Sequence, residues 1–176
     1  MASLFRDGTE LMVQYAHYHR DRRNILSHFV GIPMIVFAIG VLLSRPSFGP
    51  GLTPALVVWL LGTVWYLSRN LGLTGWATVG VNGVLFALAH AIPAESTAAW
   101  LTWGVGTFVL GWVIQFVGHY WEGRKPAFAD DLVGLLVGPA FVVGEWLFAL
   151  GLAKDMEAAI LREAGPVRTG PAQSPT

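Results

Sequence analysis

The sequence contains no cysteine and few charged residues. Without cysteine there can be no disulfide, thiolate metal site, iron–sulfur cluster or cysteine nucleophile. Only 12% of the 176 residues are charged, whereas a soluble domain has about 25%, so much of the surface must face lipid. The net charge is zero, which argues against a nucleic-acid partner because such a partner requires a basic face. The HExxH, GxSxG, P-loop and GxGxxG patterns are also absent, and with them the common hydrolase and nucleotide sites.

Apolar residues are abundant and are arranged in long uncharged runs. They make up 54% of the chain, whose mean hydropathy is +0.55. A helix that crosses a bilayer needs roughly 17–25 such residues. Residues 1–176 therefore predict a single all-α membrane domain, a polytopic transmembrane helical bundle over residues 25–153. About five spans are expected, at 25–43, 52–67, 73–92, 98–117 and 132–153.

The two ends of the chain are more polar than its middle. Residues 1–24 lack the apolar core of a signal peptide, and residues 3–22 predict an amphipathic helix on the membrane surface. Its lipid-facing residues would be Leu4, Leu11, Met12, Tyr15 and Tyr18. Residues 154–176 are expected to form a polar, partly disordered tail.

The distribution of lysine and arginine favours a cytoplasmic N-terminus. With five spans, seven of these residues fall on the side of the N-terminus and four fall on the other side. Positive charge is normally in excess on the cytoplasmic side. We therefore expect an integral membrane protein with its N-terminus inside and its C-terminus outside.

Four of the five histidines are expected at one face of the bundle. His17, His19 and His28 lie at the start of the first predicted span, and His119 ends the fourth, which returns to the same side. His90 ends the third span, about 30 Å away across the bilayer, and is excluded. A lone histidine at this depth is often just a polar residue at the headgroup level, which is the simplest interpretation of His17. For the other three, their shared side favours a joint site.

The spacing of the first two candidates requires a bend. His19 and His28 are nine residues apart, which is two and a half turns of helix, so on one straight helix they would point in opposite directions. Asn24 is a suitable N-cap for a new helix that begins at residue 25. The two imidazoles can then converge.

A second polar stripe ends the fourth predicted span. Gln115, His119 and Glu122 are four and three residues apart, so they share one helical face. Gly123 suits the left-handed position that ends such a helix. Imidazole and carboxylate ligands suit zinc, or non-haem iron with positions open for oxygen and substrate, and the ligands alone do not choose between them. Glu145, inside the last span, is as readily structural as catalytic.

Two polar segments resemble the signatures of a known family. The first contains Tyr18-His19, Asn24 and His28-x-x-Gly31-x-Pro33. The second is Gln115-Phe116-Val117-Gly118-His119-x-x-Glu122-Gly123-Arg124-x-Pro126-Ala127, followed by Asp130, Pro139 and Glu145. Together they are similar to those of the Mpo-type family of small membrane dioxygenases, which includes an iron(II)-dependent enzyme that α-oxidises 2-hydroxy fatty acids during phytosphingosine breakdown. Two positions depart from the pattern, with Asp21-Arg22 in place of Asn-Pro and Asp131 in place of an asparagine.

The resemblance implies a reaction and the residues that perform it. Fe2+ would be bound by His19, His28 and His119 on the cytoplasmic side, with Glu122 as a ligand or its neighbour. Arg124, or an arginine of residues 20–23, could pair with the carboxylate of the substrate, and Glu145 is a further catalytic candidate. The partners would be a long-chain 2-hydroxy fatty acid, O2 and membrane lipid, and the product would be one carbon shorter.

Two other functions are compatible with the same residues. The first is a haem-binding electron carrier in which two of the histidines are axial ligands. The second is a non-enzymatic transporter or scaffold in which Glu145 and the histidines form a relay.

Overall fold

The computed structural model describes residues 3–92 and 96–170, and the regular elements in these ranges are helices, which confirms the all-α prediction. A π-helical turn at Thr102–Gly106 joins α5 to α6 without a break. The helices are α1 (Gly8–Ala16), α2 (Arg22–Ser44), α3 (Pro54–Ser68), α4 (Gly72–His90), α5 (Thr97–Leu101), α6 (Thr107–Glu122), α7 (Gly134–Ala149) and α8 (Lys154–Ala164).

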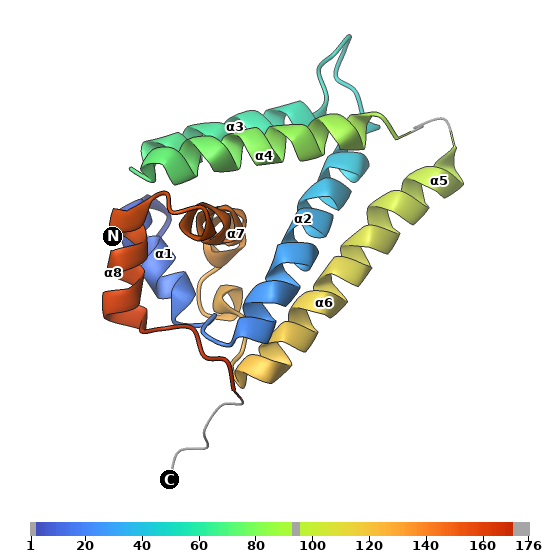
Figure 1. The fold of residues 1–176 in the computed structure, drawn as a ribbon. Coiled ribbons are helices and arrows are strands. Elements are labelled where there is room, and N and C mark those ends of the chain that lie inside the picture. The colour runs from blue at the N-terminus through green and yellow to red at the C-terminus, as the bar shows by residue number, and fades with distance from the viewer. Residues whose placement is uncertain (1–2, 93–95, 171–176) are drawn as a thin grey trace.

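Helices α2 and α6 lie side by side, with the start of α2 beside the end of α6 (Figure 1). Their backbones approach closely at glycines. A Cβ added to Gly31 would lie 2.9 Å from the carbonyl oxygen of Gly111, and a Cβ added to Gly111 would lie 2.9 Å from that of Gly31. Gly118 packs against side chains of α2 in the same way. Small residues permit such close helix contacts in membranes, and this contact brings His28 and His119 to adjoining positions.

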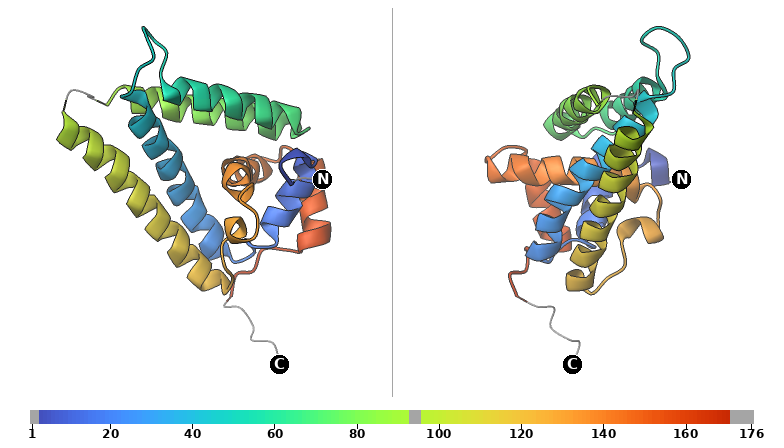
Figure 2. Two further views of the ribbon diagram at one scale, coloured as in Figure 1. Left: turned by 180° about the vertical axis from the view of Figure 1, so that it is seen from behind. Right: turned by 90° about the vertical axis from the view of Figure 1, so that its right-hand side faces the viewer.

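Helices α3 and α4 form a hairpin that contacts the end of α2 and extends over α7, at a steep angle to the α2–α6 pair (Figures 1 and 2). Its turn contacts the N-terminal segment, where the backbone N–H of Gly8 donates to the carbonyl of Arg69 at 2.6 Å. Helix α4 ends at His90, beside the end of α2 and away from the start of α2 and the end of α6. His90 lines a separate cavity with Ser44 and Trp59 and so lies apart from the other predicted candidates.

The N-terminal helix is shorter than predicted and is covered by protein. Leu11, Met12 and Tyr15 are buried against α7 and α8 instead of facing lipid, so the interfacial placement of this apolar face is wrong. The covering helix α8 arises from a segment expected to be part of a polar tail. Its Met156 and Ile160 are buried in the same core as α1, because an amphipathic helix buries its apolar stripe wherever a matching face is available.

The last apolar run does not form a straight span. Helix α7 has 16 residues, which is about 24 Å. Positive φ angles at Gly151 and Ala153 then turn α8 by 110° relative to α7. The chain returns to the start of α2, where the backbone N–H of Arg168 donates to the carbonyl of Arg20 at 2.6 Å and its carbonyl accepts from Arg22 at 2.9 Å. A fifth crossing with an external C-terminal segment is therefore wrong. Residues 171–176 of the predicted tail lie outside the described residues.

Three helices in the described ranges are long and apolar enough to cross a membrane, namely α2, α4 and the continuous α5–α6. Helix α3 is shorter at 15 residues, but it is the hairpin partner of α4, so we expect the two to cross together. Four crossings with α7–α8 as a re-entrant pair would place ten of the eleven lysines and arginines on one side, with Arg45 alone on the other. This charge bias is much stronger than that of the five-span arrangement.

We expect reporters fused before residue 6 and after residue 170 to lie on the same side of the membrane. A reporter inserted at residues 46–52, in the loop after α2, should lie on the opposite side. Paired alkaline phosphatase and fluorescent protein fusions measure both positions. Terminal fusions on opposite sides would contradict the contact between Arg168 and the loop that precedes α2.

Candidate metal centre

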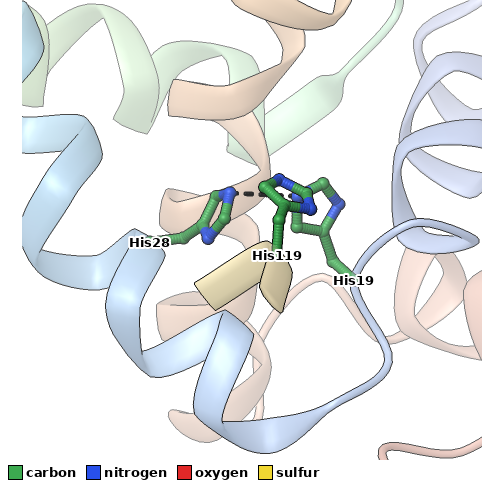
Figure 3. Close-up of side chains that lie close together, drawn as sticks. All are labelled: His19, His28 and His119. Carbon is green, nitrogen blue, oxygen red and sulfur yellow. Dashed lines mark hydrogen bonds between the residues drawn. The ribbon is translucent and has the colours of Figure 1, made fainter. Parts of the chain in front are cut away.

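Three buried histidines from three segments meet beside the start of α2 (Figure 3). His19 lies in the loop between α1 and α2, His28 in the second turn of α2, and His119 in the last turn of α6. Their ring centroids are 4.4, 4.9 and 5.1 Å apart, and one nitrogen of each lies within 4.8 Å of the others. The structure thus brings the three predicted ligands together. His17 is exposed and lies outside this group.

Asp21 makes the bend that separates the first two histidines. Helix α2 begins at Arg22, and the carboxylate of Asp21 caps it by accepting from the backbone N–H of Arg23 at 2.9 Å. The prediction of Asn24 as the cap is therefore wrong, because a carboxylate three residues earlier already fills this role. Asn24 is instead buried in the first turn, where its Nδ2 donates to the carbonyl of Tyr18 at 3.2 Å.

The hydrogen bonds of His19 and His28 leave their Nε2 atoms without protons. The Nδ1 of His19 lies 2.7 Å from the carbonyl of Tyr15, and the Nδ1 of His28 lies 2.9 Å from that of Asn24. Because a carbonyl only accepts, each Nδ1 must carry the proton, and the lone pair of each neutral ring is on Nε2. Burial lowers the pKa of His19 well below its ordinary value, which keeps this ring neutral at neutral pH.

A metal ion fits this set of donors. The two Nε2 atoms lie 3.0 Å apart, close enough for both to bind one ion at distances of about 2.0–2.1 Å. Among the described residues, the Nδ1 of His119 is buried without a hydrogen-bond partner. Facing lone pairs and an unpartnered buried nitrogen are both unfavourable, and a cation bound between the rings would relieve both. Metal-binding histidines are also typically neutral and donate a hydrogen bond from the N–H of the second ring nitrogen, often to a backbone carbonyl.

Glu122 stabilises the loop that carries His19. Its carboxylate accepts from the backbone N–H of Arg20 at 3.0 Å and of Asp21 at 2.8 Å, from Nδ2 of Asn24 at 3.0 Å, and from Nη2 of Arg168 at 2.5 Å. Glu122 is 3% exposed, so these donors replace water. Glu122 thus lies beside the candidate metal ligands, as the sequence predicts, but its oxygens are directed at the loop and not at the imidazoles.

Glu145 lies opposite Arg20, at the junction of several segments. Its Oε1 is 3.7 Å from Nη2 of Arg20. The same guanidinium donates to the carbonyls of Ala16, His19 and Gly165. Arg20 therefore links α7 to the loop between α1 and α2 (residues 17–21, the histidine loop) and to the chain after α8. This placement matches the structural alternative for Glu145.

Arg124 lies on the outer side of the histidine loop. Its Nη1 donates to the carbonyl of His17 at 3.0 Å. It lines a surface hollow together with Tyr18, Lys125 and Asp130. The structure does not bring Arg124 into the cavity that reaches His28 and His119.

Sequence reasoning missed Arg168, which pairs with Glu122 and forms backbone hydrogen bonds with the histidine loop. The sequence feature that could have indicated such a partner is Glu122 itself, because a buried carboxylate needs cationic or N–H partners. The sequence offered eleven lysines and arginines, and the five-span topology placed Arg168 on the wrong side.

Sequence reasoning also missed an apolar cavity of about 220 Å³ that reaches the metal centre. His28 and His119 line it, and it continues between α2, α6 and α7. The distance along the axis of α2 between His28 and Ile39, which both line the cavity, is about 16 Å. Its apolar wall includes Ile32, Ile35, Val36 and Ile39 of α2 and Phe108 and Trp112 of α6.

Replacing His19, His28 or His119 with alanine should weaken metal binding by at least 10–100-fold, because each removes a ligand and loss of a supporting group alone costs that much. His90→Ala should retain its metal because this residue lines another cavity. Elemental analysis of each variant, purified without oxygen, measures its metal content. Metal loss in the His90 variant with retention in the His119 variant would contradict the site.

Glu122→Gln should also lower metal affinity about 10–100-fold, because the amide turns a donor towards the backbone N–H groups of the loop. Arg168→Gln should have a smaller effect in the same direction, since three donors to Glu122 remain. Arg162→Gln is the control, as Arg162 pairs only with the exposed Glu163 in the described structure. Metal titration compares the three variants, and equal affinities for all would show that the loop is held by other contacts.

Comparisons with known proteins agree with this geometry. Residues 5–150 match the family model described as 2-hydroxy-palmitic acid dioxygenase Mpo1-like. The chain is 31% identical over 149 residues to 2-hydroxy-palmitic acid dioxygenase MPO1 of Saccharomyces cerevisiae, covering 83% of each chain. No solved structure matches it. The family model spans all three histidines, and the chain therefore belongs to the Mpo1-like family.

Proposed function

We propose that this protein is an iron(II)-dependent dioxygenase that α-oxidises long-chain 2-hydroxy fatty acids to products one carbon shorter. The observation that carries the proposal is the apolar cavity that ends on two histidines of a buried three-histidine cluster. A fatty acid has the same arrangement, with a long apolar tail and a polar head that can bind a metal. The name of the yeast relative supports this substrate class.

Iron is favoured over zinc by the type of reaction. Three imidazoles suit either metal, but zinc does not change oxidation state and O2 must be reduced. Iron(II), when bound by His19, His28 and His119, would supply the activation of O2. Three protein ligands leave positions open for oxygen and substrate.

The substrate would lie with its tail along α2 and its head at the histidines. A 2-hydroxy acid offers two oxygens, from its carboxylate and its hydroxyl, whereas an unmodified fatty acid offers the carboxylate alone. Cleavage of the C1–C2 bond with O2 as the oxidant gives the acid one carbon shorter, carbon dioxide and water, which balances all atoms. The apolar walls would exclude water from the reacting end.

Gln115 is placed to recognise the head of the substrate. It lines the cavity one turn before His119, and its Oε1 is buried without a partner among the described residues. A buried acceptor of this kind favours a ligand that donates a hydrogen bond, and the 2-hydroxyl is such a donor. Glu122, Glu145 and Arg124 would act as positioning residues, because each is bonded to the histidine loop or to residues that flank it.

The two other functions fit the geometry less well. A haem with two axial histidines has its macrocycle between the two rings, and ring centroids 4.4–5.1 Å apart leave no space for it. A relay through Glu145 would need that carboxylate near the imidazoles, but it faces Arg20. The charge bias supports a site on the cytoplasmic side.

The purified protein should consume O2 with a long-chain 2-hydroxy fatty acid and release the acid one carbon shorter. Chelation should abolish turnover, ferrous iron should restore it, and the matching acid without the hydroxyl should not react because it lacks the second oxygen. Mass spectrometry of products formed in detergent decides the matter. Turnover in chelator, or equal turnover of the non-hydroxylated acid, would count against the proposal.

A further inference from the structure

A second apolar cavity, of about 130 Å³, lies between α2, α3, α4 and α7. Its wall includes Val58 and Trp59 of α3 and Val79 and Phe86 of α4. The polar side chains beside it, Thr63, Tyr66 and Asn82, are already bonded to the protein, and the partner of Asn82 is Tyr66. The hydroxyl of Thr63 donates to the carbonyl of Trp59 at 2.9 Å, and that of Tyr66 to the carbonyl of Leu136 at 2.7 Å. The lining therefore suits an apolar ligand with no polar head.

The two cavities share part of their walls. Val36 and Ile39 of α2 and Leu135 and Pro139 of α7 line both of them. These four side chains are therefore the boundary between the cavity that reaches the histidines and the one beneath the α3–α4 hairpin. Val36 and Ile39 are only partly buried.

Neither cavity alone has the volume of a usual ligand pocket. The first, at about 220 Å³, is below the ~300 Å³ at which ligand pockets usually begin, and the two combined exceed it. The first is lined by His28 and His119, while the second lies on the other side of the four shared side chains. An extended chain that begins at the histidines and passes Val36 would enter the second cavity next.

We infer that the two cavities form one acyl channel, in which Val36, Ile39, Leu135 and Pro139 are a constriction that determines the accepted chain length. The inference rests on the proposed function, since it names where the tail of that substrate lies. Short chains end before the constriction. Long chains pass it, and their terminal methylenes occupy the cavity beneath the hairpin.

Val36→Phe narrows the constriction, and Val30→Phe is a matched control on the same helix, because Val30 is 51% exposed and lines neither cavity. Each variant is given a series of 2-hydroxy acids of increasing length, and kcat/KM is measured by product mass spectrometry. Val36→Phe should lower kcat/KM for the longest acids by about tenfold or more relative to the shortest. Val30→Phe should leave the profile unchanged.

Ile39→Ala is the complementary variant, and it should shift the preference towards longer acids by widening the constriction. Displacement of a bound fluorescent fatty acid by each 2-hydroxy acid measures the dependence of binding on chain length without requiring turnover. If the protein shows no turnover, but Val36→Phe still weakens the binding of the longest acids relative to the shortest, the channel is upheld and the proposed reaction is rejected. An unchanged profile in both Val36→Phe and Ile39→Ala, in folded protein, would overturn the channel and leave the second cavity to bulk lipid.

Discussion

The buried carboxylate of Glu122 accepts hydrogen bonds from the loop before α2, from the first turn of α2 and from the chain beyond α8. The backbone N–H groups of Arg20 and Asp21 would otherwise be buried without partners, at a cost of about 1–3 kcal/mol each. The charge is tolerated because Arg168 and these donors replace its hydration. Since Arg20 directly follows His19, the same bonds fix the position of the first histidine of the cluster.

The other two histidines of the cluster depend on how closely α2 and α6 pack. Gly31 and Gly111 allow their backbones to meet, so His28 and His119 can be adjacent although they come from different helices. Further along, Phe108 and Trp112 of α6 line the cavity with Ile35 and Val36 of α2. Small residues near the three histidines and larger ones beyond them thus produce a tight histidine cluster at one end and an apolar cavity at the other.

Local patterns predicted the parts of this arrangement that local physics determines. The first four apolar runs form helices as expected, and the stripe of Gln115, His119 and Glu122 and the helix end at Gly123 with its φ of 71° also appear as expected. The capping of α2 was misassigned to Asn24 because Asp21 is an equally good cap on sequence grounds. The apolar stripe of α1 is the same whether lipid or α8 covers it, so the sequence could not distinguish the two.

The chain beyond α7 was mispredicted for a different reason. Hydropathy alone does not reveal that α7 stops after 16 residues and that the backbone turns at Gly151 and Ala153. The partnership of Glu122 with Arg168 spans 46 residues, and no local periodicity encodes a contact of that range. The cavity was beyond sequence reasoning as well, because it depends on the relative placement of three helices.

The pairing of Arg168 with the loop between His19 and His28 also orders events during synthesis. Proteins emerge from the ribosome N-terminal end first, so both histidines are made long before the arginine that neutralises Glu122. His119 and Glu122 are made after His19 and His28 but before Arg168. The loop reaches its final set of hydrogen bonds only after α8 has been made and has packed against α1. In the nascent chain the loop that carries His19 is therefore incompletely supported until α8 has assembled with the other helices.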